Sequence, residues 1–316
     1  MQSSPTSYPR LQKRSPAAPA LKSVDRRKAA SQGDASIDPG ETDGVVDKLH
    51  AIAGLPRSGS TLLSAILRQN PRFRAEVTSP LVMLCGALQG KMTPNSEFHS
   101  FFDDERRRSL LRGLFDSYYR AAKPDEVVFD TNRSWTARSA LLKDLYPKAR
   151  IICCVREIGW IIDSLERLLR ENPLQLSRVF SFKPGTSVYA RVETLMNSEA
   201  GLIGLAWSGL REAWFGEDAS RLIVIRYETL VREPGRVMEQ LYRELGELPF
   251  AHDFNNLSYD AAEYDADLGM PGLHTVRRSV EVSSRTPSIP PDVFAKYRDS
   301  SFWNNPDLNR RKAVVF

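Results

Sequence analysis

A single loop constrains this chain more than any other segment. It reads GLPRSGSTLL, starting at Gly54. A short apolar run, 49–53, precedes the loop and a helical pattern over 59–69 follows, so the loop is expected to join a strand to a helix. Gly54 and Gly59 permit a tight turn, so the main-chain N–H groups around 58–62 are expected to point into the loop, where the positive end of the helix dipole is also directed. The segment therefore predicts an anion-binding loop.

The loop differs from the phosphate loop of nucleoside triphosphatases at one position. Ser60 stands where that motif carries lysine, and Arg57 lies inside the loop instead. An arginine makes paired hydrogen bonds to oxyanions, and the hydroxyls of Ser58, Ser60 and Thr61 add donors. A triphosphatase also needs an acid on another strand for Mg²⁺, and Asp130 follows an apolar run. A kinase or triphosphatase with a degenerate loop, or a glycine turn that only caps a helix, stays open as an alternative.

Strand-like and helix-like segments alternate through the rest of the chain, as expected for a parallel sheet in an α/β fold. We predict a P-loop-like three-layer fold over 45–316, with a central parallel sheet flanked by helices. The irregular segment 247–316 is expected to form a C-terminal lobe of the same domain. The predicted strands are 49–53, 126–130, 150–155 and 221–226, and the predicted helices are 59–69, 104–122, 135–146, 159–170, 188–215 and 234–245.

The net charge of +5 is concentrated at the N-terminus. Residues 1–28 hold seven basic residues and one acidic residue, so the remainder is nearly neutral and nucleic-acid binding is not expected. The Ser-, Pro- and Ala-rich segment 1–44 predicts a disordered tail. The sequence has no apolar run of about 18 residues, so no membrane span is expected. Three cysteines without Cys-x-x-Cys spacing favour a reducing compartment, the cytoplasm, over disulfides or a metal site.

The loop resembles the 5′-phosphosulfate loop of the sulfotransferases that use 3′-phosphoadenosine 5′-phosphosulfate (PAPS). Its Pro-Arg-Ser-Gly form, at 56–59, is similar to that of the bacterial and the tyrosylprotein sulfotransferases. The resemblance implies a donor site that needs no metal and releases adenosine 3′,5′-bisphosphate. The residues that it implies for the 5′-phosphosulfate are Arg57, Ser58, Gly59, Ser60, Thr61 and Leu62.

A second motif resembles the family's site for the 3′-phosphate of the donor. The family places an arginine at a strand end and a serine eight residues later, and this chain has Arg156 and Ser164 in CVREIGWIIDSLERL. The following RYETL segment places Tyr227 as a contact for the adenine end. The family also closes a late basic loop over the 3′-phosphate, and the comparable segment here is 269–285. Its candidates are Arg277, with Arg278 and Arg285.

The general base is left between two candidates. The tyrosylprotein relatives use a glutamate about twenty residues after the loop arginine; Glu76 lies nineteen residues after Arg57, although an ungapped comparison points to Thr78. His274, which titrates near neutrality, is the rival. Relatives often carry a lysine that assists the leaving oxygen. Thr131 occupies that place here, so Arg133 is the nearest substitute.

These residues predict a sulfotransferase that moves a sulfuryl group from PAPS to a hydroxyl or amine of a small molecule or peptide. The apolar stretches 80–92 and 188–215 are expected to shape the acceptor pocket. Asp130 is expected to orient Arg133 or the acceptor if it does not bind Mg²⁺. A nucleotide kinase or triphosphatase, and a non-catalytic nucleotide-binding module, are the two competing hypotheses.

Overall fold

The computed structural model describes residues 46–180 and 186–316. All of them belong to one compact unit, Asp43–Phe316. The tail predicted at 1–44 lies outside the described residues, so its disorder stays a prediction.

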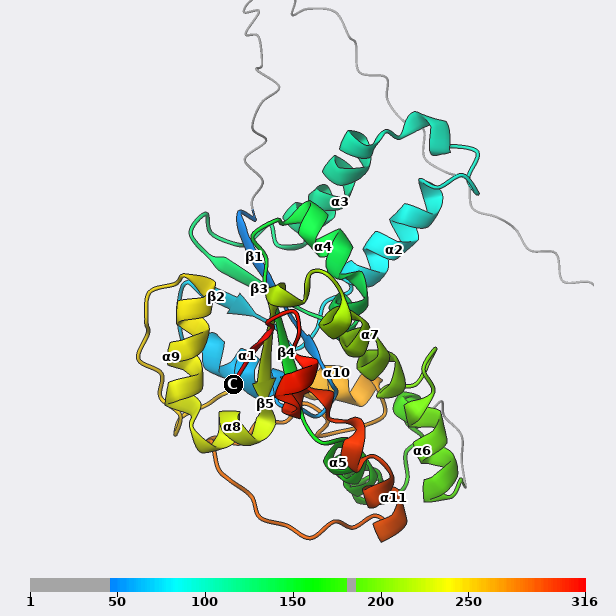
Figure 1. Cartoon of the computed structure of the whole chain (residues 1–316), viewed down its shortest axis with the longest axis vertical. Coiled ribbons are helices and arrows are strands. Elements are labelled where there is room, and N and C mark those ends of the chain that lie inside the picture. Colours follow the sequence, from blue (N-terminus) through cyan, green and yellow to red (C-terminus); the bar gives the residue numbers. More distant parts are fainter. Residues whose placement is uncertain (1–45, 181–185) are drawn as a thin grey trace, which may run out of the picture. The chain divides into compact units, whose positions relative to one another are not determined.

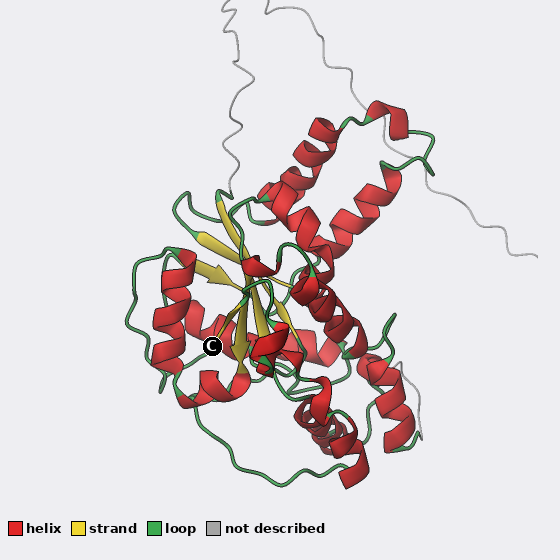
Figure 2. Ribbon diagram, viewed as in Figure 1, coloured by secondary structure: helices red, strands yellow, loops and turns green. Residues whose placement is uncertain are grey.

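Six parallel strands form the sheet of the described part, in the order β2-β3-β1-β4-β5-β6. Figure 2 shows the strands in yellow, with helices around them. The parallel sheet and the four predicted strands are confirmed. Two very short strands at the sheet edges, β2 and β6, were not predicted. The strands are β1 (Lys48–Gly54), β2 (Phe73–Ala75), β3 (Val127–Thr131), β4 (Ile151–Val155), β5 (Leu222–Arg226) and β6 (Val314–Val315).

Helices form in all six predicted stretches. The stretch 188–215 forms two helices instead of one, because the Asn197 side chain accepts the main-chain N–H groups of Glu199 and Ala200 and holds a turn there. The helices are α1 (Ser60–Leu67), α2 (Leu81–Lys91), α3 (Asp104–Tyr118), α4 (Ser139–Leu145), α5 (Ile158–Glu171), α6 (Val188–Met196), α7 (Gly204–Phe215), α8 (Tyr227–Arg232), α9 (Pro234–Leu245), α10 (Ala262–Asp267) and α11 (Pro291–Lys296). Of these, α2, α8, α10 and α11 were not predicted.

The two faces of the sheet carry separate hydrophobic cores because side chains alternate along each strand. On β4, Cys153 points to one core and Cys154 to the other, and Ala51 and Ile52 of β1 divide in the same way. Helices α1 and α9 cover the face of Ile52, whereas α5 and α7 cover the opposite face (Figure 1). Helices on both faces confirm the three-layer arrangement.

The C-terminal segment extends the sheet as well as forming a lobe. Strand β6 pairs with β5, and the Phe316 N–H donates to the Val224 carbonyl at 2.9 Å. The Arg226 guanidinium in turn donates to the Phe316 carbonyl at 2.9 Å. The expectation that 247–316 is only an irregular lobe is therefore corrected: its last residues complete the sheet.

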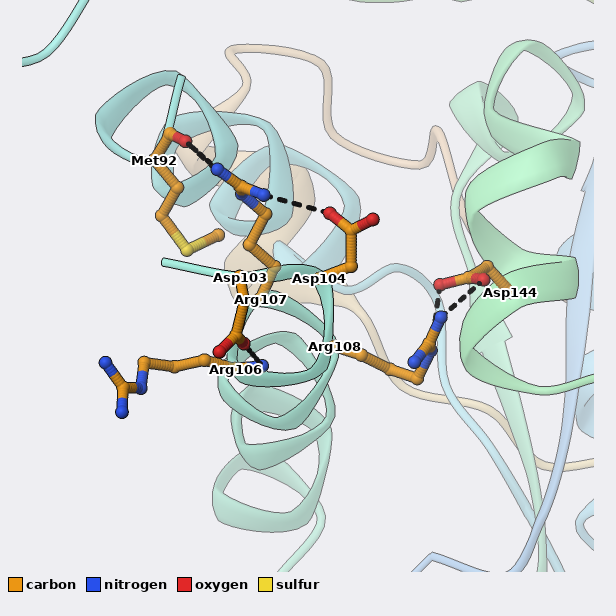
Figure 3. A network of polar contacts seen from close by, with 7 residues as sticks. All are labelled: Met92, Asp103, Asp104, Arg106, Arg107, Arg108 and Asp144. Atoms are coloured by element: carbon orange, nitrogen blue, oxygen red, sulfur yellow. Dashed lines mark hydrogen bonds and ion pairs between the residues drawn. The ribbon is translucent and has the colours of Figure 1, made fainter. Parts of the chain in front are cut away.

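Helices α2 and α3 are joined to each other and to α4 by arginine contacts (Figure 3). Asp103 accepts the Arg106 N–H at 2.8 Å and so caps the start of α3. Arg107 donates to the Met92 carbonyl at the end of α2, and Arg108 makes a two-pronged pair with Asp144 of α4. These contacts fix α2 and α3 against the domain.

Candidate functional site

The carboxyl ends of β1, β3 and β4 open onto a single cavity of about 810 Å³. Ligands of open α/β sheets bind at this end of the strands. Within the described residues, the lining leaves out Ser58, Glu76 and Arg278. The residues singled out in the sequence that do line the cavity are Arg57, Gly59, Ser60, Thr61, Leu62, Arg133, Arg156, Ser164, Tyr227, His274, Arg277 and Arg285.

The loop between β1 and α1 is pinned to β4. The Leu55 N–H donates to the Cys154 carbonyl at 2.8 Å. Gly54 has φ 98°, and a β-carbon there would stand 2.2 Å from the same carbonyl oxygen. Arg57 also adopts positive φ, at 55°, a strained conformation for a residue other than glycine. The loop backbone is therefore held in a fixed shape at the edge of the cavity.

We expect Gly54→Ala to destabilise the fold, because the new methyl group meets the backbone of β4 and not a movable side chain. The loss in the free energy of unfolding should be about 2 kcal/mol or more, measured by chemical denaturation. Gly90→Ala in α2 is the matched control, since nothing lies within 4 Å of its new methyl. Equal stability of the two variants would show that this contact relaxes without cost.

The main-chain N–H groups at the start of α1 are available to a ligand. In residues 46–180 and 186–316 none of the N–H groups of 58–62 has a hydrogen-bond acceptor, as expected for the first turn of a helix. Ser58 itself is buried and donates its hydroxyl to the Pro56 carbonyl at 3.2 Å. Its hydroxyl is therefore engaged within the loop, and Ser58 is not part of the cavity lining in the described chain.

Arg57 connects the two predicted phosphate sites. Its Nε donates to Ser164 Oγ at 3.1 Å, and its Nη1 donates to the Leu273 carbonyl. Burial lowers the pKa of Arg57, and the charges of Arg156 and Arg285 lower it further. The cation thus lies in a crowded basic environment that an anion would relieve.

Arg156 has unused capacity for an anion. Its guanidinium lies over the Tyr227 ring at 4.2 Å, and its Nε is 3.8 Å from Glu228. That Nε is buried, and no residue within 46–180 or 186–316 offers it a hydrogen-bond acceptor. Burial is the main cause that lowers the pKa of Arg156, and the charge of the neighbouring Arg285 lowers it further. A buried donor without a partner is costly, so the site is built for a group that supplies an acceptor.

Arg285 reaches the cavity from the C-terminal loop and is held by helix α5. Its guanidinium lies over Trp160 at 5.5 Å and 3.4 Å from the fully buried carboxylate of Asp163. Burial alone would raise the pKa of Asp163, but hydrogen bonds from Ser288 and Arg167 hold it below its usual value. Asp163 precedes Ser164 in α5, and its contacts with Arg285 and Ser288 hold the C-terminal loop against that helix. The sequence did not point to this residue.

We expect Asp163→Asn to weaken binding of adenosine 3′,5′-bisphosphate about threefold to tenfold, because Arg285 loses its anchoring charge. Loss of charge-assisted hydrogen bonds should also lower stability by about 1.5–3 kcal/mol. Calorimetric titration and thermal unfolding measure the two effects. The control is Asp144→Asn, which removes an exposed carboxylate far from the cavity lining. Lower stability with unchanged affinity would assign Asp163 to folding alone.

The side chains of Arg277 and Arg278 are more exposed than that of Arg285 and are held by weaker contacts. Arg277 lines the cavity but is 69% exposed, with Glu281 at 3.9 Å. Arg278 is exposed and donates to Asn256 at 3.3 Å. Of the three arginines in this loop, Arg285 is therefore the one that the structure fixes beside Arg156.

His274 forms a dyad with Asp265 of α10. The Nδ1 atom lies 2.5 Å from the Asp265 carboxylate, and the His274 main-chain N–H donates to the other oxygen at 2.8 Å. Asp265 is 2% exposed. Burial lowers the pKa of His274, opposed by Asp265 and reinforced by Arg57 and Arg133. With the proton on Nδ1, the Nε2 atom is the proton acceptor. No spacing rule in the sequence pointed to Asp265.

Glu76 and Asp130 are placed away from the cavity. Glu76 follows β2, and the neighbouring Val77 and Thr78 line the cavity in its place. Asp130 is fully buried and accepts from Tyr119 at 2.7 Å, as well as from Ser79 and Trp135. The expectation that Asp130 orients Arg133 or binds Mg²⁺ is therefore wrong, because its oxygens are occupied inside the core. Among described residues no cluster of three His, Cys, Asp or Glu could hold a metal.

The far end of the cavity is apolar and is built by the α6–α7 junction. Ala200, Leu202 and Leu205 line it, together with Val179 and Leu268. The stretch 188–215 therefore contributes to the pocket as expected. The stretch 80–92 does not: no residue of α2 is part of the lining in the described chain.

In the described part of the chain, no helix is both long and apolar enough to cross a membrane.

Comparisons with known proteins converge on one family. Residues 51–251 match the model of the sulfotransferase family. The chain is 26% identical to nodulation protein NoeE of Sinorhizobium fredii (strain NBRC 101917 / NGR234), over 62% of this chain and 49% of that protein, so it spans about half of that relative.

One solved structure shows the same fold, and a second is similar at a lower score. The sulfotransferase domain from the curacin biosynthetic pathway is 15% identical, with 80% of this chain and 96% of that chain covered, at a TM-score of 0.51. The sulfotransferase domain from the Synechococcus PCC 7002 olefin synthase is 19% identical, with 83% and 97% covered, at a TM-score of 0.47.

Proposed function

This chain belongs to the sulfotransferase family, and from that premise we propose that it transfers a sulfuryl group from PAPS to a hydroxyl or amine acceptor, releasing adenosine 3′,5′-bisphosphate. One observation carries the proposal: the hydrogen bond from Arg57 Nε to Ser164 Oγ, 3.1 Å long. It joins the loop proposed for the 5′-phosphosulfate to the residues proposed for the 3′-phosphate. The two anion sites therefore belong to one cavity and suit a single nucleotide with two anionic groups.

The proposed roles follow from what each group offers. Arg57 and the N–H groups of 58–62 hold the 5′-phosphosulfate. Arg156 and Ser164 hold the 3′-phosphate, with Arg285 as the third contact. Tyr227, stacked against Arg156, borders the adenosine. PAPS supplies the sulfuryl group, which passes between leaving and attacking oxygens through a loose transition state by analogy with phosphoryl transfer.

The proton of the acceptor is proposed to go to Nε2 of His274. Asp265 keeps the other nitrogen protonated and fixes the ring, the arrangement that a general base needs. Glu76 was the other candidate, and its side chain does not line the cavity. We therefore assign the base to His274 and leave Arg133 to contacts with the acceptor or the sulfuryl oxygens.

The proposal also covers cofactor and compartment. It requires no metal, so binding of the bisphosphate should be unaffected by a chelator. The three cysteines are buried and free, which supports a reducing compartment such as the cytoplasm. The acceptor is proposed to be a small molecule or peptide, and no nucleic acid takes part.

Transfer of labelled sulfate from PAPS to a panel of phenols, sugars and peptides tests the activity. Thermal shifts with adenosine 3′,5′-bisphosphate, compared with ATP plus Mg²⁺, test the ligand. The proposal expects a labelled product and a larger shift with the bisphosphate in the presence of chelator. A preference for Mg-ATP would favour a kinase or triphosphatase. Bisphosphate binding without transfer to any member of the panel would favour a non-catalytic module.

A further inference from the structure

We propose that the acceptor carries an anionic group, a carboxylate or a phosphate, that binds Arg133 and Arg178 at the far side of the cavity from the 3′-phosphate site. This inference rests on the proposed function and names its substrate class. It starts from the distribution of positive charge around the cavity, which exceeds what the donor needs.

The strand order separates donor and acceptor sides. In the sheet, β1 lies between β3 and β4. The proposed phosphate sites follow β1 and β4, so the nucleotide occupies that side. Arg133 follows β3 and lines the cavity on the other side of the phosphosulfate loop. An in-line transfer brings the acceptor from the side opposite the leaving bisphosphate, which is the side of Arg133.

Among the residues that the structure describes, seven arginines and two glutamates line the cavity. The donor carries about four negative charges, counting two for its terminal phosphate. Both glutamates already lie near arginines, Glu228 at 3.8 Å from Arg156 and Glu281 at 3.9 Å from Arg277. Arg57, Arg156 and Arg285 form the two donor sites. The net charge of these lining side chains is +5, so about one positive charge remains beyond the four negative charges of the donor, and Arg133 and Arg178 stand outside the proposed donor sites.

Arg133 and Arg178 are two lining arginines that lie outside the proposed donor sites. In the described part of the chain neither guanidinium has a carboxylate within ion-pair distance. Arg133 lies near enough to His274 to lower its pKa. The main-chain N–H of Arg178 donates at 3.1 Å to the carbonyl of Leu268, the residue that follows α10. The backbone of Arg178 is thereby tied to the end of the helix that also carries Asp265, the partner of His274, and both arginines line the same cavity as His274.

Apolar side chains also line the cavity. Val179, Ala200, Leu202, Leu205 and Leu268 line it. An acceptor that fits has a hydroxyl near His274, an apolar body against these side chains and an acidic group at the arginines. A hydroxy acid or a phosphorylated alcohol has this chemistry, and a neutral sugar or an amine does not.

Two matched pairs of acceptors test the inference. The carboxylate pair is 4-hydroxyphenylacetate and 4-hydroxyphenylacetamide, and the phosphate pair is 4-hydroxyphenyl phosphate and its dimethyl ester. We expect the acid to exceed its neutral partner about tenfold in kcat/KM, a difference of about 1.4 kcal/mol, in at least one pair. The pair with the larger ratio identifies the anion.

Arg133→Gln and Arg178→Gln should each bring that ratio toward one. Because the ratio compares two acceptors with the same variant, a general loss of activity cancels. Arg211→Gln is the control, since Arg211 stacks on Trp207 in α7 and lies outside the cavity lining; its ratio should match the wild type. A wild-type ratio near one in both pairs, or a ratio unchanged by both substitutions, overturns the inference.

Failure of the proposed function gives a different result. If no phenol is turned over, calorimetric titration of the same pairs into protein saturated with adenosine 3′,5′-bisphosphate yields the ratio from binding. Preferential, Arg133-dependent binding of the acid would then support the anion site without the transfer activity. Equal binding of acid and neutral partner would refute the anion site in that case too.

Discussion

His274→Ala is expected to lower kcat about 10²- to 10⁴-fold, the usual effect of losing a general base. Affinity for adenosine 3′,5′-bisphosphate should change little, because His274 makes its hydrogen bonds to Asp265 and not to the residues of the two anion sites. Sulfate-transfer kinetics and calorimetric titration measure the two quantities. Full activity of His274→Ala together with an inactive Glu76→Gln would move the base to Glu76.

The pH profile of kcat/KM tests the proposed role of His274 as the general base in a second way. Burial and the charges of Arg57 and Arg133 lower the pKa of His274, so the neutral ring persists to more acidic pH than an ordinary histidine with a pKa of about 6.5. Activity should therefore hold as the pH falls to 6.5 and decline only below it. In His274→Ala this acid limb should disappear.

Arg156→Ala is expected to weaken donor binding by about 2–3 kcal/mol, or about 30- to 150-fold, because a charge-assisted contact is lost. The buried Nε without a partner is the reason for placing the effect at this residue. Calorimetric titration of adenosine 3′,5′-bisphosphate measures it. Arg243→Ala, an exposed arginine paired with Glu239 on α9, should leave affinity unchanged. Equal affinity of the two variants would remove Arg156 from the donor site.

The sequence was informative wherever a local pattern has one physical meaning. The β-branched runs at 127–131 and 151–155 became central strands, because only a fully buried parallel strand tolerates such runs. The loop starting at Gly54 needed its glycine for a backbone approach that leaves no room for a β-carbon. Both features are set by residues next to each other in the chain.

The parts that escaped prediction are too short to show a pattern or depend on contacts that no sequence motif announces. Strand β6 has two residues, too few for any alternation to show. Asp265 acquires its role only because the chain returns to place His274 beside it, nine residues later. Asp130 looked like a site residue because it ends a strand, but its hydrogen bonds come from Ser79, Tyr119 and Trp135 inside the core.

The account depends on two anion sites that share one nucleotide, and calorimetric titration with three nucleotides tests this most directly. Adenosine 3′,5′-bisphosphate should bind with chelator present at least tenfold more tightly than adenosine 5′-monophosphate or adenosine 3′-monophosphate, a gain of about 1.4 kcal/mol or more. Arg156→Ala should remove the advantage over the 5′-monophosphate, and Arg57→Ala the advantage over the 3′-monophosphate. A bisphosphate that binds no better than either monophosphate would contradict the account.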